Sequence, residues 1–540
     1  MISYIPFLTV LATFPTAVIT ASQTNWNNVT GTSNITFPTD VGNLNDIVYG
    51  GLPFNAQEDK LNSTEFQKYY APEMRWLPKN ADKDNATSDD IFKNFGPYTP
   101  WRPAEGLFPE TEAFRTLPKQ CNLKQVHLLY RHGSRYPTDG LDSGPGAFFA
   151  LVQNATRNGT FKATGELDFL HSWNYSLGKN ILNPQGTQEL FDHGVRAYYE
   201  YAKLLANETD KPVIRTTSSS RVLDSARYWT LGFFGWDAED KMNLEVLTEA
   251  PDQNNTLEPK YSCPNGKKFS FGDDMRKEWQ KLYLQEPMKR IQKDIHGLNL
   301  TIEDMANMIS LCAYETPGIG YSSFCNLFSR KEYEGFEYDA DLKFQGNSGF
   351  MNPMGKAMGI GYVTEFINRA TNSNYSGPQA EQNNTLDKNT TYFPLKKPLY
   401  ADFSHDSSIV NILTAFNFTQ IGDYMNATNP DPHRRFRASQ IVPFAAKIAF
   451  EIMDCDENNE SNEFIRVKIN DALLPLDQGQ GCEKRKDAIC KLDNFIQHLK
   501  DNAYRAAKFN LSCYGKNGSD FTITKPVKSG ALTDEMILKN

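Results

Sequence analysis

Three short apolar runs, each followed by a polar turn, mark the central part of the chain. The runs are Gln125–Tyr130, Pro212–Ile214 and Pro398–Phe403. Short apolar segments with β-branched and aromatic residues, bounded by turn residues, are typical of buried strands. The turns that follow them are Arg131–Pro137, Arg215–Ser220 and Ser404–Asp406. We therefore expect three strands that each end in a set of polar side chains.

Helix-like spacing of apolar residues follows these turns. It covers Val222–Phe234, Ser407–Phe416 and a less regular segment after Pro137, and longer helical patterns cover Pro184–Ala206 and Gly355–Ala370. Strand, polar turn and helix, repeated at wide separations, predict an α/β domain with a mostly parallel sheet. Ligands of such sheets bind beyond the carboxyl ends of the strands, which is where all three turns would lie.

A second region, residues 236–344, has a mainly helical pattern, with apolar spacing typical of helices at Met275–Ile295 and Ile302–Ala313. We expect it to form a smaller α-helical cap that is inserted into the α/β domain. The large domain would then consist of residues 95–235 and 345–540, and the cap would cover the crevice at the strand ends.

The first 94 residues differ in character from the rest. Residues 1–21 contain an apolar stretch that is broken by threonines and prolines and ends in small residues, which predicts a secretory signal peptide. A membrane anchor is the alternative, but a stretch of about 15 residues is too short to favour it. Residues 22–94 are rich in Asn, Thr, Asp and Lys, and we interpret them as an extension that wraps the domain or is partly disordered.

Glycosylation motifs and cysteines indicate the compartment. Eighteen Asn-x-Ser/Thr sequons run from Asn28 to Asn517. This number predicts N-linked glycans on a protein that is secreted or held in the cell wall. The eight cysteines predict four disulfides in an oxidising compartment, with the pairing left open. No cysteine pair has the spacing of a zinc site, so neither a metal nor another cofactor is expected.

The charge of the chain narrows its partners. The formal net charge is −9 and the basic residues form no long run, which disfavours nucleic acid and anionic membranes as partners. A locally cationic pocket in an acidic protein suits a small anionic ester. The sequence is also compatible with a homo-oligomer.

The turn Arg131-His132-Gly133-Ser134-Arg135-Tyr136-Pro137 carries the strongest chemical signal. Planar guanidinium groups bind pairs of phosphoryl oxygens, and an imidazole can act as a nucleophile. A lone histidine after a strand is more often structural, but two flanking cations are costly unless an anion lies among them. We therefore interpret His132 as a candidate nucleophile. Ser134 is a weaker rival, because no base adjoins it in the sequence.

Two later turns offer complementary groups. Arg221 follows a run of hydroxyl residues at a predicted helix start, where anions are favoured, and Arg215 in the same loop competes with it. His405 and Asp406 stand between a predicted strand and a helix, as His132 does. A carboxylic acid in a pocket can protonate a departing alkoxide, although Asp406 would serve equally well as a plain N-cap.

Together these segments resemble the histidine acid phosphatase family, which contains fungal acid phosphatases and phytases. The heptapeptide is matched intact, the family's later arginine segment is matched by Ser220–Ala226, and its His-Asp pair by His405 and Asp406. Further matches are Asn352–Gly355, Pro443–Ala446 and Val467–Leu476, so the resemblance covers roughly residues 95–515. It implies a phosphoglycerate-mutase-like α/β domain with an α-helical cap.

The resemblance also implies roles. His132 would attack phosphorus and form a phosphohistidine, and Asp406 would protonate the leaving alcohol. The phosphoryl group would be bound, without a metal, by Arg131, Arg135, Thr138, Arg221 and His405. The implied disulfides are Cys121–Cys455, Cys263–Cys513, Cys312–Cys325 and Cys482–Cys490. Because Asp406 must start protonated, activity is expected to be best on the acid side of neutrality.

Several functions stay open at this point. We favour a secreted acid phosphatase that also acts on phytate, myo-inositol hexakisphosphate. A dedicated phytase of narrow specificity would need cations at the cap, and the candidates, or else plain surface charges, are Lys267, Lys268, Arg330 and Lys343. A non-catalytic cell-wall glycoprotein that retains the fold is another alternative, and the complete catalytic set argues against it. A mutase is less expected, since an exported enzyme does not meet glycolytic substrates.

Overall fold

The computed structural model describes residues 91–251, 253–374, 379–457 and 460–538. The chain divides into two units, residues 1–51 and residues 52–540, and all described residues belong to the second. The predicted signal peptide at residues 1–21 and residues 22–90 of the predicted extension lie outside the described residues.

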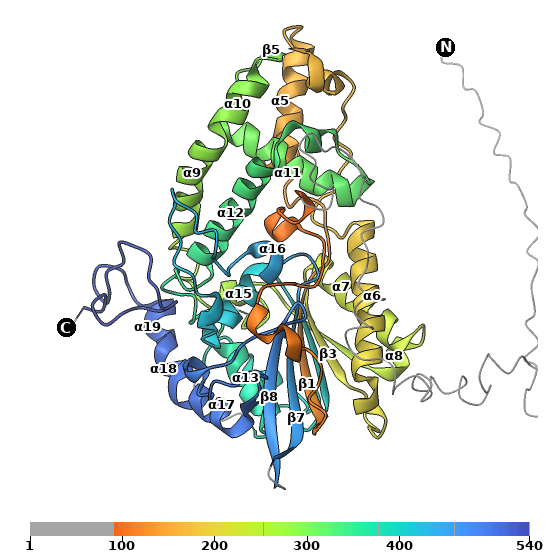
Figure 1. Ribbon diagram of the computed structural model, residues 1–540, viewed down its shortest axis with the longest axis vertical. Coiled ribbons are helices and arrows are strands. Elements are labelled where there is room, and N and C mark those ends of the chain that lie inside the picture. Colours follow the sequence, from red (N-terminus) through yellow and green to blue (C-terminus); the bar gives the residue numbers. More distant parts are fainter. Residues whose placement is uncertain (1–90, 252, 375–378, 458–459, 539–540) are drawn as a thin grey trace, which may run out of the picture. The chain divides into compact units, whose positions relative to one another are not determined.

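The second unit is built around an eight-stranded mixed sheet (Figure 1). Its parallel part consists, in order of pairing, of β1 (Cys121–Arg131), β6 (Leu399–Ser404), β3 (Val213–Thr217) and β4 (Asn243–Leu247). Its antiparallel part continues from β1 to β7 (Lys447–Glu457) and β8 (Glu460–Ile469), and β8 also pairs with β9 (Ala472–Leu473) and β10 (Cys490–Lys491). The three predicted strands are β1, β3 and β6. The predicted α/β class with parallel core strands is confirmed.

Helices cover both faces of this sheet (Figure 1). One face carries α6 (Pro184–Tyr201), α7 (Ser220–Phe234) and α8 (Ala238–Lys241), and the other carries α13 (Ile360–Ala370), α15 (Asp406–Ala415) and α17 (Leu492–His498). Successive residues of a strand point to opposite faces, so Leu128 and Tyr130 of β1 join the first core and Leu129 joins the second. The helices predicted near 184–206, 222–234 and 407–416 are α6, α7 and α15.

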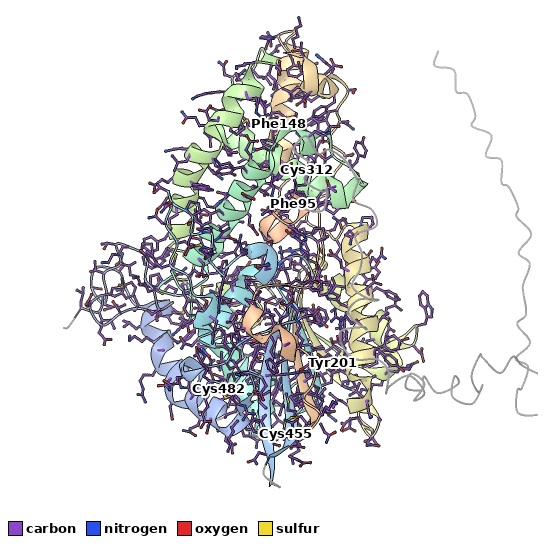
Figure 2. All side chains as sticks on the ribbon, in the orientation of Figure 1. Phe95, Phe148, Tyr201, Cys312, Cys455 and Cys482 are labelled. Atoms are coloured by element: carbon purple, nitrogen blue, oxygen red, sulfur yellow. A yellow bond between two sulfur atoms is a disulfide. The ribbon has the colours of Figure 1, made fainter. Side chains whose placement is uncertain are left out.

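A separate layer of helices lies at the top of Figure 1. It contains α5 (Pro145–Arg157), α9 (Phe271–Tyr283), α10 (Gln285–Gln292), α11 (Ile302–Ile319) and α12 (Arg330–Asn347). The layer has its own core, which includes Phe95, Phe148 and Cys312, whereas Tyr201 and Cys482 belong to the cores of the sheet (Figure 2). The remaining short elements are β2 (Lys162–Ala163), β5 (Ile295–His296), α14 (Asn384–Asp387), α16 (Ala438–Ile441), α18 (Tyr504–Ala507) and α19 (Phe509–Tyr514).

This helical layer differs from the predicted single insertion of residues 236–344. The helix α5 precedes that range, yet its Phe148 and Val152 belong to the core of the layer, as do Ile91 and Phe92. The strand β4 lies within the range but pairs with β3 in the main sheet. Helical periodicity shows that a helix has an apolar face, and it does not show which core that face joins.

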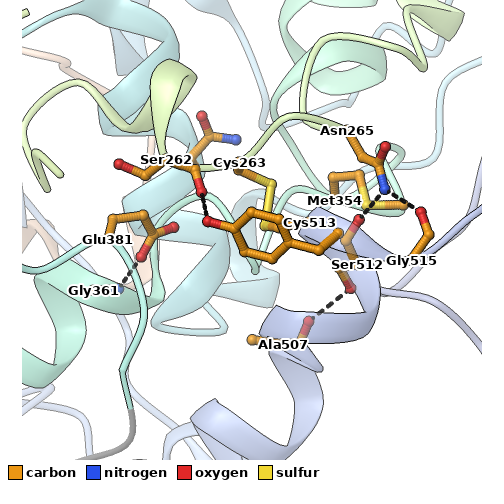
Figure 3. Close-up of a disulfide and its surroundings, with 12 residues drawn as sticks. Ser262, Cys263, Asn265, Met354, Gly361, Glu381, Ala507, Ser512, Cys513 and Gly515 are labelled. Carbon is orange, nitrogen blue, oxygen red and sulfur yellow. Dashed lines mark hydrogen bonds between the residues drawn. A yellow bond between two sulfur atoms is a disulfide. The ribbon is translucent and has the colours of Figure 1, made fainter. Parts of the chain in front are cut away.

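Four disulfides connect these elements, and they are the four pairs that the family resemblance implies, so this prediction is confirmed. The pair Cys121–Cys455 joins directly opposed residues of β1 and β7. The pair Cys263–Cys513 joins the segment before α9 to α19 (Figure 3). Beside it, the Tyr514 hydroxyl donates to the Ser262 carbonyl at 2.8 Å. This disulfide therefore anchors the segment that follows β4.

Buried carboxyl groups collect beside the sheet. Asp402 of β6 pairs with Arg215 of β3 and Arg369 of α13, at 2.8 Å each. Glu381 and Asp387 are also buried, and each has one carboxyl oxygen without a hydrogen-bond partner among the described residues. Burial raises the pKa of Glu381 to about 8. Burial, together with the neighbouring Glu365, raises the pKa of Asp387 to about 8.

These groups predict a fold that is most stable in acid. A carboxyl group whose pKa is raised in the folded state contributes its full stability below its unfolded pKa of about 4, and that contribution is lost as the pH rises towards 8. Salt-bridged Asp402 acts in the opposite sense, because Arg215 and Arg369 outweigh burial and hold its pKa well below the usual range. Its contribution is lost below about pH 4, so we expect the melting temperature to be highest near pH 4–5.

Glu381→Gln isolates one of these groups. The amide keeps an oxygen that accepts from the Gly361 N–H, as the carboxyl does at 2.8 Å, but it does not titrate. We expect the fall in melting temperature between pH 5 and pH 7.5 to become smaller by at least about 2 °C, measured by scanning calorimetry. Glu278→Gln, at an exposed position of α9, is the matched control, and an unchanged slope in Glu381→Gln would contradict the assignment.

Candidate active site

The carboxyl ends of β1, β6 and β3 bring the predicted turns together. Arg131 at the end of β1 lies opposite Ser404 at the end of β6, and the His132 N–H donates to the Ser404 carbonyl at 3.2 Å. The third turn leads from β3 into α7, which begins at Ser220. The six residues predicted to be catalytic lie in these turns or directly after them, and they are Arg131, His132, Arg135, Arg221, His405 and Asp406.

His132 is held in one protonation form. Its Nδ1 lies 2.9 Å from the carbonyl oxygen of Gly133, which can only accept a hydrogen bond, so Nδ1 carries the hydrogen and Nε2 keeps its lone pair. The residue is 1% exposed. Burial, followed by the charges of Arg131 and Arg221, holds the pKa of His132 well below its ordinary value. The ring is therefore neutral, and Nε2 is available as a nucleophile even in acid.

The three arginines are anchored mainly by neutral acceptors. Arg131 donates from Nη1 to the carbonyl oxygens of Pro97 and of Val442, the latter at 2.6 Å. Arg135 donates to the Tyr136 carbonyl at 2.9 Å. The Nε–H groups of the three arginines 131, 135 and 221 have no acceptor among the described residues. Guanidinium groups that are fixed without equivalent counter-charges create a site for an anion.

Arg221 is the arginine that reaches this site, and its sequence rival Arg215 does not. Arg221 donates from Nη1 to Ser219 Oγ at 2.7 Å and to Asn180 Oδ1 at 3.0 Å. Its Nη2 lies 3.1 Å from His405 Nδ1. Arg215 is instead buried in the ion pairs with Asp402 and Glu365, and its charge is neutralised there.

Asp406 faces the arginines as the first residue of α15, and the N-cap position is held by His405. Its Oδ2 lies 2.5 Å from Arg131 Nη2, and its Oδ1 accepts from the Ser407 N–H at 2.8 Å. Burial alone would raise the pKa of Asp406, but Arg131 and Arg135 outweigh it and hold this pKa well below the usual range. In the protein without substrate, Asp406 is therefore a carboxylate, and a proton-donor role requires a proton that arrives with the substrate.

A buried carboxyl group that sequence reasoning missed holds the nucleophile turn in place. Glu189 of α6 accepts from the Ser134 N–H at 2.8 Å, from the Ser134 hydroxyl at 3.0 Å and from the Trp101 N–H at 3.1 Å. Burial raises the pKa of Glu189 to about 7. The Ser134 hydroxyl is thus engaged away from catalysis. No local signal marks Glu189, which lies 55 residues from Ser134.

A cleft of about 700 Å³ adjoins the site, and of the six predicted catalytic residues Arg135 and Asp406 line it. Arg135, Thr138 and Asp406 form part of its lining, and α11 and α12 of the helical layer supply Tyr314 and Lys343. Further cations of the lining are Lys260, Lys267 and Arg276. The segment that carries Lys260 and Lys267 is the one anchored by the disulfide in Figure 3. The lining also contains the acids Asp139, Glu258, Asp273 and Asp339. Lys260 pairs with Glu258 at 3.0 Å and Arg276 with Asp339 at 2.9 Å, so the entrance carries charges of both signs.

Only two of the four predicted entrance cations lie in this cleft, namely Lys267 and Lys343. Lys268 turns to Asn265, to whose Oδ1 it donates at 2.8 Å. Arg330 lines a second cavity of about 880 Å³, whose lining contains none of the predicted catalytic residues. Adjacent lysines such as Lys267 and Lys268 are equivalent in sequence, and only the course of the backbone separates them. No group of His, Cys, Asp or Glu that could hold a metal ion occurs in the part of the chain that the structure describes.

Several known proteins are similar to this chain in sequence. The chain matches the histidine phosphatase superfamily (branch 2) over residues 122–470. It is 30% identical to phytase A of Aspergillus oryzae over 407 residues, or 72% of this chain and 84% of that protein. It is 33% identical to phytase A of Aspergillus terreus over 403 residues, or 71% of this chain and 83% of that protein.

Two solved structures share the fold. The phytase from D. castellii superposes with a TM-score of 0.64 at 22% identity and covers 82% of this chain and 93% of its own. The multiple inositol polyphosphate phosphatase of Bifidobacterium longum, in complex with phosphate, has a TM-score of 0.53 at 12% identity and covers 77% and 98%. At these identities the likeness concerns the fold alone.

The close approach of α6 to the nucleophile turn predicts a sharp effect of one methyl group. A Cβ added at Gly186 would lie 2.0 Å from the Ser134 carbonyl oxygen, so helix and turn must separate. For Gly186→Ala we expect kcat on a small aryl phosphate to fall by about ten-fold or more and the free energy of unfolding by about 1–3 kcal/mol. Gln188→Ala, exposed on the same helix, should change neither. Full activity in Gly186→Ala would show that the contact does not position His132.

Proposed function

Because the chain belongs to branch 2 of the histidine phosphatase superfamily and is a phosphomonoester hydrolase, we propose that it is an acid phosphatase that forms a phosphohistidine on His132. The observation that carries the proposal is the neutral His132, with its Nε2 lone pair free, among three arginines. These guanidinium groups bind the phosphoryl oxygens and stabilise the charge that develops in the transition state.

His132 and Asp406 account for the bonds that form and break in the two steps of the reaction. Nε2 of His132 forms a bond to phosphorus while the bond from phosphorus to the ester oxygen breaks, and the proton on Nδ1 stays on the ring, donated in a hydrogen bond to the Gly133 carbonyl. Asp406 gives its proton to the departing alkoxide. In the second step, water attacks phosphorus, its proton passes to the Asp406 carboxylate, and the bond from phosphorus to nitrogen breaks. Free phosphate leaves and His132 regains its lone pair.

The acid preference follows from the source of the proton. Asp406 is ionised beside Arg131 in the free protein, so it cannot bring its own. A phosphomonoester loses its last proton with a pKa of about 6, and below that pH it arrives as a monoanion. The site then exchanges this proton between the phosphoryl oxygen and the Asp406 carboxylate. Activity therefore declines above the pH at which the substrate becomes a dianion.

Highly phosphorylated substrates such as phytate suit the cleft. Lys260, Lys267, Arg276 and Lys343 line it together with Arg135. Lys260 pairs with Glu258 and Arg276 with Asp339, so Lys267 and Lys343 are the cations that phosphate groups not being cleaved would meet. The relatives named phytase A support the same substrate. A dedicated phytase of narrow specificity is the second candidate, and the same cations favour it. The complete set around His132 counts against a non-catalytic glycoprotein.

Export is part of the proposal. None of the sequon asparagines in the described residues is buried, and most of them are exposed, which is the placement that N-linked glycans require. The described helices include none that is long and apolar enough to cross a bilayer. The four disulfides suit an oxidising compartment. We therefore propose a secreted glycoprotein, either released or retained in the cell wall.

A phosphoenzyme test addresses the nucleophile. Rapid mixing with a phosphomonoester labelled in its phosphate, quenched into alkaline denaturant, should trap label on His132 of the natural protein. His132→Ala should keep its fold, as judged by circular dichroism, and lose both label and activity by at least about 10³-fold. Ser134→Ala, which removes the rival hydroxyl, should retain the label. Label that persists in His132→Ala, or that disappears in Ser134→Ala while the fold is kept, would contradict the mechanism.

A substrate panel at acid pH separates the two candidate functions. We expect release from both phytate and a small aryl phosphate, and a dedicated phytase would leave the aryl phosphate almost untouched. Lys267→Glu and Lys343→Glu should each lower kcat/KM for phytate by about ten-fold, because each places a negative charge in the cleft, and should change kcat/KM for the aryl phosphate by about two-fold or less. Lys268→Glu is the matched control outside the cleft, and an equal effect of all three variants would refute the assigned roles.

A further inference from the structure

The ring of His405 is held between an arginine and a carboxylate. Its Nε2 lies 2.6 Å from Glu249 Oε1, and its Nδ1 lies 3.1 Å from Arg221 Nη2. His405 is 4% exposed and its ring centroid is 5.8 Å from that of His132. Glu249 stands just after β4, in a segment remote from every motif that the sequence singles out. The Glu249 carboxylate is therefore linked to the active site by its contact with the His405 ring.

The two contacts define where the hydrogen of His405 lies. Burial alone would raise the pKa of Glu249, but the hydrogen bonds from His405 and Thr217 and the nearby charge of Lys260 oppose it, and this pKa lies well below the usual range. An ionised carboxylate only accepts, so Nε2 of His405 carries the hydrogen. Nδ1 of a neutral ring is then an acceptor, and the Arg221 N–H donates to it. Without a ligand, the neutral ring satisfies both neighbours.

Phosphate changes this requirement. If His405 binds the phosphoryl group, as the proposed function has it, its Nδ1 faces an oxygen other than the one that shares the substrate's proton with Asp406. Such an oxygen only accepts, so Nδ1 must itself become a donor. Because Nε2 already donates to Glu249, the ring must take up a second proton and become an imidazolium. Arg221 can then turn its Nη2–H from His405 to the phosphate.

The surroundings of His405 show why that charge needs a partner. Positive or neutral groups face it from α7, where Arg221 lies, and from the turn directly after β1, where His132 lies. Asp406 of its own helix is engaged by Arg131. On the side of β4, Glu258 is 3.9 Å from Nε2, and Lys260 lies 3.0 Å from both Glu249 and Glu258. Glu249 is thus the carboxylate that contacts the ring, and Lys260 weakens its effect.

We propose that Glu249 is a positioning residue that orients His405 and stabilises its charged form, so that it sets the upper pH limit of phosphate binding. Lys260 acts on the same pair in the opposite direction. The inference rests on the proposed function. It adds that phosphate binding is coupled to the uptake of one proton by His405, and that this coupling depends on a side chain that does not contact the substrate.

Paired variants test the coupling from both sides. Glu249→Gln keeps an oxygen acceptor for the Nε2–H and removes the negative charge. Lys260→Met keeps the length of the side chain and removes the positive charge, with Glu249 and His405 both in place. For each we would measure kcat and KM on a small aryl phosphate from pH 3 to pH 8, together with the binding of inorganic phosphate by calorimetry, which needs no turnover.

Opposite shifts are the expected result. In Glu249→Gln the alkaline limb of kcat/KM and of phosphate affinity should move down by about one pH unit or more, mainly through KM, and in Lys260→Met it should move up. Glu249→Asp, which keeps the charge, should restore part of the shift. Glu278→Gln on α9 is the control for loss of a remote carboxylate.

Two outcomes would overturn the inference. An alkaline limb in Glu249→Gln that coincides with that of the natural protein would show that the carboxylate does not control His405. Shifts of the same sign in Glu249→Gln and Lys260→Met would indicate general damage to the site. Neither result bears on the role of His132 as nucleophile, because the phosphoenzyme on His132 is measured separately. Absence of that phosphoenzyme in the natural protein would count against the proposed function alone.

Discussion

The site depends on three buried or half-buried guanidinium groups that are held close together without equivalent negative charge. Arg131 and Arg135 are fixed largely by backbone carbonyls, and Arg221 by a hydroxyl and an amide. Such a cluster is unfavourable for the folded protein by itself, because like charges repel strongly where water is excluded. Burial, and after it this repulsion, holds the pKa of His132 well below its ordinary value, and the same uncompensated charge suits an anionic ligand. In the proposed mechanism, one electrostatic constraint would thus both keep the nucleophile neutral and favour a phosphorylated substrate.

Two other buried arginines, Arg215 and Arg369, have a structural purpose instead. Arg215 and Arg369 are as deeply buried as Arg131, yet both are neutralised by Asp402, and Arg215 also by Glu365. These ion pairs link β3, β6 and α13, and they leave no charge free for a ligand. Buried Glu381 and Asp387 extend this group with carboxyl groups that favour the protonated state. The stability of the fold and the chemistry of the site therefore both favour acid conditions, and they do so through separate groups of residues.

Much of the architecture was predictable, because its signals are local. The apolar runs that became β1, β3 and β6 end directly in the turns with the reactive residues, and parallel strands gather such ends at one edge of a sheet. His132, Arg221 and His405 were identified in this way. The antiparallel strands β7 and β8 and the origin of α5 in the helical layer were not. In both cases the periodicity shows which face of an element is apolar. It does not show which element packs against that face, because that element lies elsewhere in the chain.

By itself, the sequence predicted the turn with His132 and the later residues Arg221, His405 and Asp406, and through the family resemblance it gave the disulfide pairs, since each is carried by neighbouring residues or by a motif. Only the tertiary structure showed that Arg215 is neutralised by Asp402 while Arg221 contacts His405, which of the adjacent lysines 267 and 268 lines the cleft, and that Glu189 and Glu249 hold Ser134 and His405. Glu249 is 156 residues from His405. A carboxylate acquires such a role from the charge and distance of what lies beside it in space, and neither quantity is encoded locally.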